Sequence, residues 1–217
     1  MKNVIATIAA VITTSSLAFA APVTSLAGYT LGQECVGEEF TSYTKKVANP
    51  EDWKDSIKVE ALKATKKVGE HVTVHVNCGI IDNTVYSINL STNDPETSKA
   101  IRNRFEELLG RPHDNEEKYD TKSMNLLGKY YPAQKSLFRN WDLGEGVKGI
   151  TSTTHTFHKT EGLSSRGGAQ LYIDGIQAAE WEFLKTGGAE SSGKKKKLLL
   201  TAYFNNNYIS IKTRKTQ

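Results

Sequence analysis

The chain has few of the residue patterns that mark a catalytic or metal-binding protein. Among its 217 residues are only two cysteines, Cys35 and Cys78, and five histidines. The cysteines lie 43 positions apart, which excludes a Cys-x-x-Cys redox turn. No Gly-x-Ser-x-Gly segment frames a nucleophilic serine, and the histidines do not cluster with carboxylates as metal ligands do. The motifs therefore assign no cofactor, no metal and no reaction.

Proline is also scarce, and long hydrophobic runs are confined to the first twenty residues. The five prolines form no Pro-rich linker that would divide the chain, and no later segment has the length of a transmembrane helix. Hydrophobic residues make up 38% and charged residues 24%, as is typical of a folded globular chain. We therefore predict a single domain over residues 21–217.

The first twenty residues have the pattern of a secretory signal peptide. Lys2 precedes a mostly apolar run, and Ala18, Phe19 and Ala20 form the small-x-small sequence expected before a cleavage site. A membrane anchor is the alternative, but the polar residues 13–16 interrupt the run. We expect cleavage after Ala20 and a periplasmic or secreted protein.

In an oxidising compartment, Cys35 and Cys78 are predicted to form a disulfide. The bond would attach an extended N-terminal segment, residues 21–43, to the strands that follow. Closing a loop of about forty residues contributes roughly 4 kcal/mol by the chain-entropy estimate.

The strongest fold pattern lies between His71 and Pro112. Apolar and polar residues alternate over residues 72–78 and 85–90 with turn residues between them, which predicts a β-hairpin. A helix is predicted over residues 95–109, where Asp94 can cap the N-terminus and Gly110 can end the helix. The predicted fold class is α+β, an antiparallel sheet with one main covering helix.

Further elements are predicted with less detail. Strands are expected at residues 57–62, 137–143, 147–158 and 171–173, with a C-terminal hairpin at 198–213. Polar side chains on both faces of 147–158 indicate an edge or exposed position.

Irregular segments are expected between these elements. A capped helical turn is predicted at residues 49–52, and surface loops at 111–123 and 161–168. Residues 176–185 fit either a helix or a strand.

Two groups of residues are candidates for binding. The net charge is +4, yet residues 191–217 carry +7 and residues 21–190 carry −4, so the C-terminal end is basic. The run Lys194, Lys195, Lys196 and Lys197 can contact an anionic surface, or it can keep a strand edge soluble. The preceding Gly188-to-Lys194 segment lacks the Ser or Thr that a phosphate-binding P-loop needs after its lysine.

The second group is aromatic. Trp141, Tyr172 and Trp181 are predicted in strand-like segments, where aromatic side chains either line a groove or belong to the core. Nucleic acid is an improbable ligand for an exported chain. His155 and His158 would point to opposite faces of a strand, so they would not share a metal ion.

The order of strand, strand, capped helix, Leu109-Gly110-Arg111-Pro112 turn and Trp141 strand resembles that of uncharacterised exported bacterial α+β proteins. The resemblance covers residues 71–175 and implies a bacterial envelope setting with no assigned catalytic site. Our leading hypothesis is an exported, non-enzymatic binding domain for a protein or an anionic envelope component. The alternatives are a cell-envelope hydrolase that uses His155, His158 or an acidic residue, and an inhibitor or immunity protein with a protruding loop at 161–168.

Overall fold

The structure is a computed structural model that describes residues 23–52 and 54–186. Its elements in chain order are β1 (Ser25–Leu26), β2 (Tyr29–Thr30), β3 (Phe40–Ala48), β4 (Ser56–Val68), β5 (Val72–Cys78), β6 (Val85–Thr92), α2 (Pro95–Leu109), β7 (Asn115–Thr121), β8 (Met124–Leu126), β9 (Lys129–Tyr131), β10 (Ala133–Gly144), β11 (Val147–His158), β12 (Gly162–Ile173) and α3 (Ile176–Lys185). The predicted antiparallel sheet is present, but the helical content is small, so the fold is closer to mainly β than to α+β.

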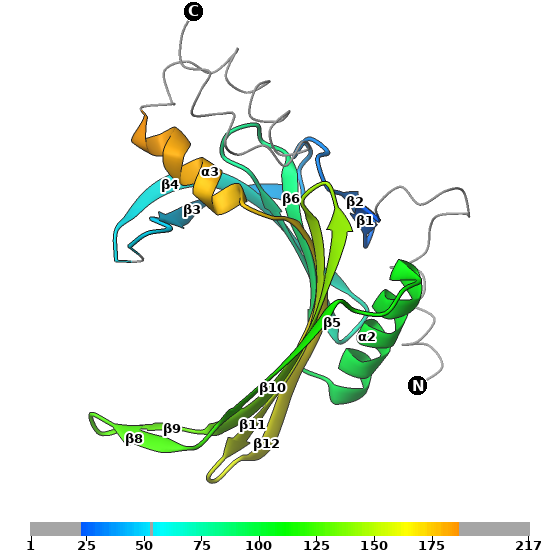
Figure 1. Cartoon of the computed structure of the whole chain (residues 1–217), viewed down its shortest axis with the longest axis vertical. Helices are drawn as coiled ribbons and strands as arrows, with labels where there is room; N and C mark the ends of the chain where they lie inside the picture. The colour runs from blue at the N-terminus through cyan, green and yellow to red at the C-terminus, as the bar shows by residue number, and fades with distance from the viewer. Residues whose placement is uncertain (1–22, 53, 187–217) are drawn as a thin grey trace, which may run out of the picture.

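Eight strands form one curved antiparallel sheet in the order β3-β4-β5-β6-β12-β11-β10-β7. Helix α2 and the short β1–β2 pair lie on one side, which we call the helix face (Figure 1). The sheet curves around its other side, which we call the concave face, and α3 lies there beside β3 and β4. None of the described helices is long and apolar enough to cross a membrane.

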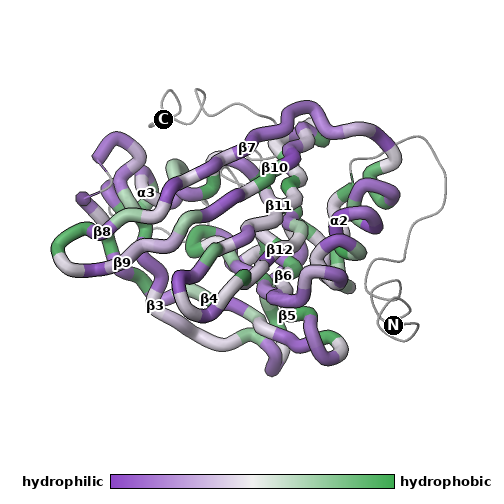
Figure 2. Tube along the Cα trace, turned by 90° about the horizontal axis from the view of Figure 1, so that it is seen from below, coloured by the Kyte–Doolittle hydropathy of each residue, from purple (hydrophilic) through white to green (hydrophobic). Residues whose placement is uncertain are grey.

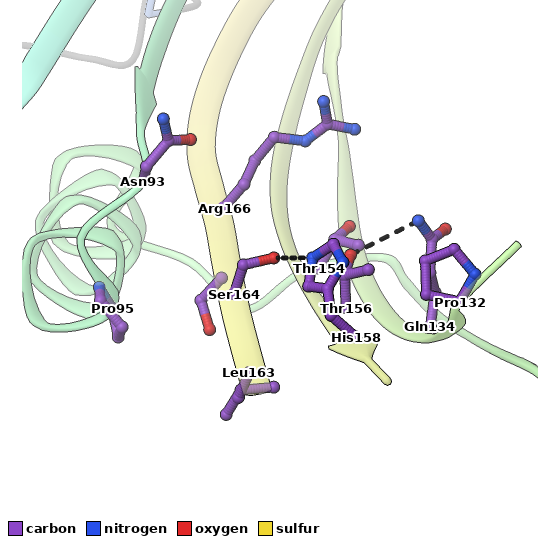
Figure 3. Close-up of a pocket in the computed structure, with 11 residues that line it drawn as sticks. Asn93, Pro95, Pro132, Gln134, Thr154, Thr156, His158, Leu163, Ser164 and Arg166 are labelled. Carbon is purple, nitrogen blue, oxygen red and sulfur yellow. Dashed lines mark hydrogen bonds between the residues drawn. The ribbon is translucent and has the colours of Figure 1, made fainter. Parts of the chain in front are cut away.

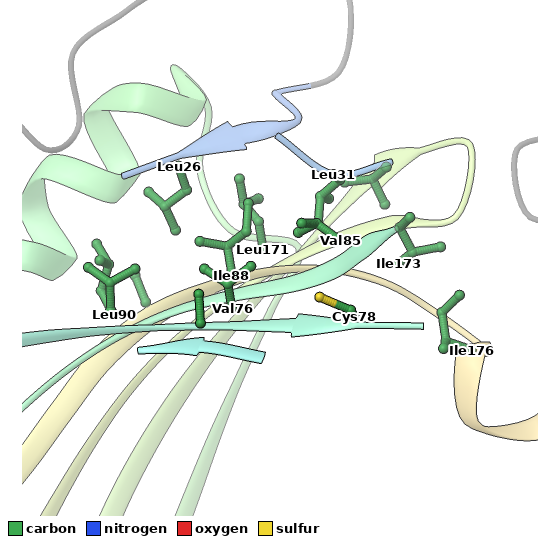
Figure 4. Packing of buried hydrophobic residues seen from close by; sticks show 14 of the residues in the cluster. Leu26, Leu31, Val76, Cys78, Val85, Ile88, Leu90, Leu171, Ile173 and Ile176 are labelled. Carbon is green, nitrogen blue, oxygen red and sulfur yellow. The ribbon is translucent and has the colours of Figure 1, made fainter. Parts of the chain in front are cut away.

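The hydrophobic core lies on the helix face. Strand register places a mostly apolar row of side chains across six neighbouring strands, namely Ala64, Val76, Ile88, Leu171, Gly149 and Trp141. Leu26 and Leu31, from the segment around β1 and β2, cover Val85 and Ile88 of the sheet (Figure 4). The core is therefore enclosed between one sheet surface and the elements that pack on it.

Helix α2 has the boundaries that its sequence predicts. The Asp94 carboxylate accepts a hydrogen bond from the backbone N–H of Thr97 at 2.7 Å, and Gly110 ends the helix with a φ of 62°. Its buried residues Ile101 and Phe105 face the sheet. Both predictions, the helix and its caps, are confirmed.

Glycines let this helix approach the sheet closely. A Cβ atom on Gly149 would lie 3.3 Å from the Phe105 ring, and one on Gly167 would lie 1.9 Å from the Ser98 Oγ. A side chain at Gly167 would displace α2, because close-packed interiors do not absorb an added methyl group freely.

A disulfide joins Cys35 to Cys78, as predicted. It ties the β1–β2 segment to the end of β5, and the backbone of Cys35 also donates a hydrogen bond to the carbonyl of Asn83 at 2.8 Å. The N-terminal segment is more ordered than predicted, since it contains β1, β2 and the first residues of the edge strand β3.

The prediction of a loop at residues 161–168 is wrong, because residues 162–168 form the first part of strand β12. Their glycine and serine composition favours a loop locally, but the pairing of β12 with β11 and β6 overrides that preference. Gly168 has a structural role here, since a Cβ atom on it would lie 1.8 Å from the Leu90 carbonyl oxygen.

Three other predictions need correction. The charged segment 111–123 is not a loop throughout, because β7 forms an edge strand there, and its charges suit an exposed edge. Strand β11 is interior rather than at an edge, since it pairs with both β10 and β12. Residues 49–52 form a bend without a helix, in which Asn49 Oδ1 accepts the backbone N–H of Glu51.

Residues 176–185, which fit helix or strand, form α3. The predicted C-terminal hairpin at 198–213 lies outside the described residues.

Candidate functional site

The concave face is built from side chains that carry hydroxyl and amide groups. It comprises the residues that alternate with the core residues along β4, β5, β6, β12, β11 and β10. One cross-strand row on it consists of Thr65, His75, Asn89, Gln170, Ile150 and Asn140. The same strands that present an apolar row to α2 therefore present a mainly polar row on the opposite side.

The centre of this face is neutral and half-buried. Ser and Thr side chains dominate the neighbouring rows, and several are hydrogen bonded to one another. Gln170 Nε2 donates to Ser87 Oγ at 2.8 Å, and the hydroxyls of Ser136 and Thr154 lie 3.0 Å apart. Charged groups occupy the margins of the face, where their residues are Lys63, Lys67, Glu117, Asp142, Lys148 and Arg166.

A cavity of about 720 Å³ lies at one end of the concave face, where β12 extends beyond β6 (Figure 3). The last β6 residue in register with β12 is Thr92, opposite Gly167, so the described part of the sheet leaves Gly162 to Arg166 with no strand on that side. Asn93 and Pro95, at the start of α2, form the far wall. Side chains of β10 and β11, among them Gln134, Thr154 and Thr156, also line the cavity, so it extends from the uncovered edge of β12 over the concave face.

Two Ser–His pairs lie at this end, on opposite faces of the sheet. Ser164 Oγ is 2.8 Å from His158 Nε2 in the cavity wall, and Ser165 Oγ is 2.7 Å from His155 Nδ1 on the helix face. The two histidines thus point to opposite faces, as their spacing predicts. The described contacts of His158 include no carboxylate that would orient it as a catalytic base.

A smaller cavity of about 350 Å³ lies beside α2 on the helix face. Arg102, Lys118, Lys135 and His155 contribute basic groups to its lining, together with Asp120. Arg102 Nη1 donates to Thr153 Oγ1 at 3.3 Å. No group of three or more His, Cys, Asp or Glu residues in the described part of the chain could hold a metal ion.

The opposite end of the concave face is covered by α3 and contains a buried ion pair. Lys45 Nζ on β3 lies 2.7 Å from each carboxylate oxygen of Glu180, whose side chain is fully buried. Glu180 also accepts the backbone N–H of Ile80 at 3.1 Å, and Lys45 Nζ lies 4.3 Å from the centre of the Tyr86 ring. Burial, followed by the negative charge of Glu180, raises the pKa of the Tyr86 hydroxyl.

A β-bulge explains why Tyr86 joins this cluster. The register between β5 and β6 shifts between Asn77 and Cys78, so Val85 pairs with Cys78 while Ser87 pairs with Asn77. Tyr86 is the extra residue, and a bulge re-aims the side chains next to it. The alternation predicted over residues 85–90 is therefore interrupted at its start, since Val85 belongs to the core and does not share the face of Ser87 and Asn89.

The structure separates the three aromatic residues of the predicted groove. Trp141 is buried in the helix-face core, packs edge-to-face on Phe105 and donates its indole N–H to the Arg111 carbonyl. Trp181 is buried on α3, and only Tyr172 lies on the concave face, half-buried. Of the two roles predicted for these aromatic residues, Trp141 and Trp181 therefore have the core role. Lys194, Lys195, Lys196 and Lys197 lie outside the described residues.

The polar residues of the concave face were missed by sequence reasoning, although a signal for them exists. Along β12 the buried residues Ala169, Leu171 and Ile173 alternate with Gln170 and Tyr172, and β5 and β11 show comparable alternation. The outward positions of these strands carry mainly Ser, Thr, Asn and Gln. The scarcity of charge at such positions is the informative feature.

No protein-family model, curated protein or solved structure matches this chain.

Proposed function

We propose that the mature chain is an exported, non-enzymatic binding domain that contacts a protein partner of the cell envelope through its concave face. The observation that carries the proposal is the neutral, half-buried surface of hydroxyl and amide groups around Asn89 and Gln170. The signal-peptide pattern and the disulfide support an exported setting.

The distribution of charge on the concave face supports a protein partner. Interfaces between proteins are depleted of charged residues at their centres and carry polar, solvent-accessible groups around the rim. The concave face has this arrangement, with Asn89 and Gln170 at its centre and Lys63, Lys67 and Arg166 at its margins. Ser and Asn side chains also adapt their hydrogen bonds to a partner at modest cost.

The unpaired part of β12 offers a second kind of contact. The backbone of residues 162–166 has no neighbouring strand on the β6 side among the described residues, and a cavity of about 720 Å³ lies there. An extended segment of the partner can add to such an edge through main-chain hydrogen bonds. Edge strands β3 and β7 carry Lys and Glu residues that oppose this kind of pairing, whereas residues 162–166 carry one charge, on Arg166.

The experiment is quantitative partner capture with the mature chain, residues 21–217, as bait in an envelope extract. A charge placed at the centre of the face, Asn89→Lys, is expected to reduce recovery of the partner at least about tenfold, because it introduces an unpaired charge into the contact. The matched control is Thr44→Lys on β3, where the exposed side chain lies opposite Glu60.

Thr44→Lys is expected to recover the same partner as the native chain. Equal recovery by Asn89→Lys and the native chain would exclude the concave face as the binding surface. A far-ultraviolet circular dichroism spectrum and an unfolding midpoint for each variant show whether the fold is retained.

A hydrolase is the second candidate, and the Ser164–His158 pair is the observation that favours it. A serine nucleophile needs an adjacent base at hydrogen-bonding distance, and this pair has that distance inside a cavity. Turnover of envelope polymer by the native chain, abolished by Ser164→Ala, would establish it in place of the binding proposal.

A further inference from the structure

The β8–β9 hairpin is an arm that extends the β7–β10 strand pair beyond the main sheet (Figure 1). Its side chains are unusually apolar for an exposed position. Met124 is 55% exposed, Leu126 is 54% exposed and Leu127 is 99% exposed, and the tyrosines at positions 130 and 131 are exposed as well. The tip of the arm is correspondingly coloured as hydrophobic in Figure 2. Contiguous apolar groups on a surface commonly mark an interaction site.

The backbone of the turn gives independent support. Leu127 has a φ of 50° and Gly128 a φ of 75°, so the turn needs the left-handed conformation at both positions. Asn-Gly or Asp-Gly is favoured in such two-residue turns, and a bulky residue with positive φ is uncommon. An almost fully exposed leucine therefore occupies a position where asparagine would suit both the backbone and the solvent. Strain of this kind persists mainly where a residue has a function.

The order of residues along the arm matches the depth profile of a lipid surface. Leu126 and Leu127 lie at the tip, while Tyr130 and Tyr131 follow on β9, toward the main sheet. Leucine suits the acyl boundary of a bilayer, and tyrosine suits the headgroup level, where its ring is in apolar surroundings and its hydroxyl is hydrated.

The charge of the arm is entirely positive. From Lys122 to Lys135 the chain contains three lysines and no acidic residue, whereas the adjoining β7 contains three acidic residues. Lys129 Nζ lies 5.6 Å from the centre of the Tyr131 ring, which keeps its charge near the aromatic level of the arm. Lysines beside apolar insertion residues are attracted to anionic headgroups.

We propose that the β8–β9 arm binds the surface of an anionic lipid bilayer, with Leu126 and Leu127 inserted at the headgroup–acyl boundary and Lys122 and Lys129 among the headgroups. The inference is separate from the proposed binding of a protein partner, which uses the concave face. Attachment by the arm would hold the concave face close to a membrane surface.

Vesicle co-sedimentation of the mature chain tests the proposal. The probes are vesicles of phosphatidylcholine alone and vesicles with roughly seven parts phosphatidylcholine to three parts phosphatidylglycerol. We expect the native chain to bind the anionic vesicles more tightly than the neutral ones, and high salt to weaken the binding.

The decisive variant is Leu127→Asn. It is expected to lower vesicle affinity about tenfold, on the scale of one apolar side chain withdrawn from the bilayer. Its unfolding midpoint is expected to be unchanged or raised, because asparagine tolerates the left-handed backbone better than leucine does. Loss of binding would then not be a consequence of unfolding.

Two further variants complete the experiment. Lys129→Glu is expected to lower binding to anionic vesicles several-fold and to leave binding to neutral vesicles nearly unchanged. Val36→Asn is the matched control, because Val36 is 64% exposed and lies outside the arm.

Three results would overturn the proposal. In the first, the native chain binds neither kind of vesicle. In the second, Leu127→Asn binds as tightly as the native chain, and in the third, Val36→Asn loses as much binding as Leu127→Asn. Concentration-dependent self-association that Leu127→Asn abolishes, without vesicle binding, would assign the arm to a second copy of the chain instead.

Discussion

The two faces of the central sheet differ although they are made by the same strands. On β12, Leu171 is fully buried beneath the helix-face core, while its neighbour Gln170 points to the concave face and donates a hydrogen bond to Ser87. Successive side chains of a strand point to opposite faces, so adjacent residues belong to different environments. The helix face holds the hydrophobic core, whereas most of the concave face stays accessible.

The two environments meet beneath α3. At one end of the concave face α3 covers β3, and the side chains beneath it are buried like those of the core. Here Lys45 and Glu180 are enclosed as an ion pair, whereas beyond α3 the face is neutral and half-buried. Coverage by a helix, rather than membership of one face, therefore decides how deeply a side chain is buried.

The largest expected effect comes from the adjacent residues of β12. Leu171→Ala is expected to lower the free energy of unfolding by about 4 kcal/mol, since it removes a fully buried side chain and leaves a cavity. Gln170→Ala, one position earlier, is expected to cost about 1 kcal/mol, because it removes one side-chain hydrogen bond at a half-buried site. Denaturant titration measures both, and similar losses for the two variants would contradict the division into two faces.

The covered end of the concave face gives the next prediction. Glu180→Gln is expected to lower the free energy of unfolding by about 3 kcal/mol, because it leaves the charge of Lys45 buried without a counter-charge. The double variant Lys45→Met/Glu180→Met is the control and is expected to recover most of this loss, since it leaves no buried charge. A double variant as unstable as Glu180→Gln would show that the pair is not the source of the effect.

The smallest effect is expected at the margin of the helix face, at Glu116 on β7. Hydrogen bonds from Lys118 and Arg139 lower the pKa of the Glu116 carboxyl to about 2. A lowered pKa in the folded state stabilises the fold above the pKa of the unfolded chain, and this contribution is lost as pH falls from the ordinary glutamate range toward pH 2. As pH falls over that range, the unfolding midpoint of Glu116→Gln should decrease slightly less than that of the native chain. An identical decrease in the two proteins would show that the hydrogen bonds of Glu116 with Lys118 and Arg139 do not contribute.

Several local features could be read directly from the residues. Helix α2 was predicted with its caps, because Asp94, Pro95 and Gly110 act through neighbours in the chain. Strand β5 followed from period-two alternation, and the disulfide followed from the presence of only two cysteines. The helix and the strand depend on residues that are close in the chain, and two cysteines allow only one disulfide within the chain.

Other features depended on contacts between distant segments and were misread. Residues 162–168 are rich in glycine and serine, yet they form a strand because β11 provides its ladder and because two adjacent glycines permit close approach to α2 and β6. Trp141 was placed in a possible groove, but the position of α2 makes its side of β10 the core. Strand β11 was predicted at an edge because polar side chains occupy both of its faces, yet β10 and β12 pair with it on either side.

The residues themselves specify the elements whose signals lie within a few positions of one another, namely the ends of α2 and the alternation along β5. Contacts between distant segments select the side of each strand that becomes the core, gather the hydroxyl and amide groups on one surface, and bring Lys45 to Glu180, 135 positions away. Strand alternation defines two equivalent faces, and these differ only after helices from distant parts of the chain dock on them.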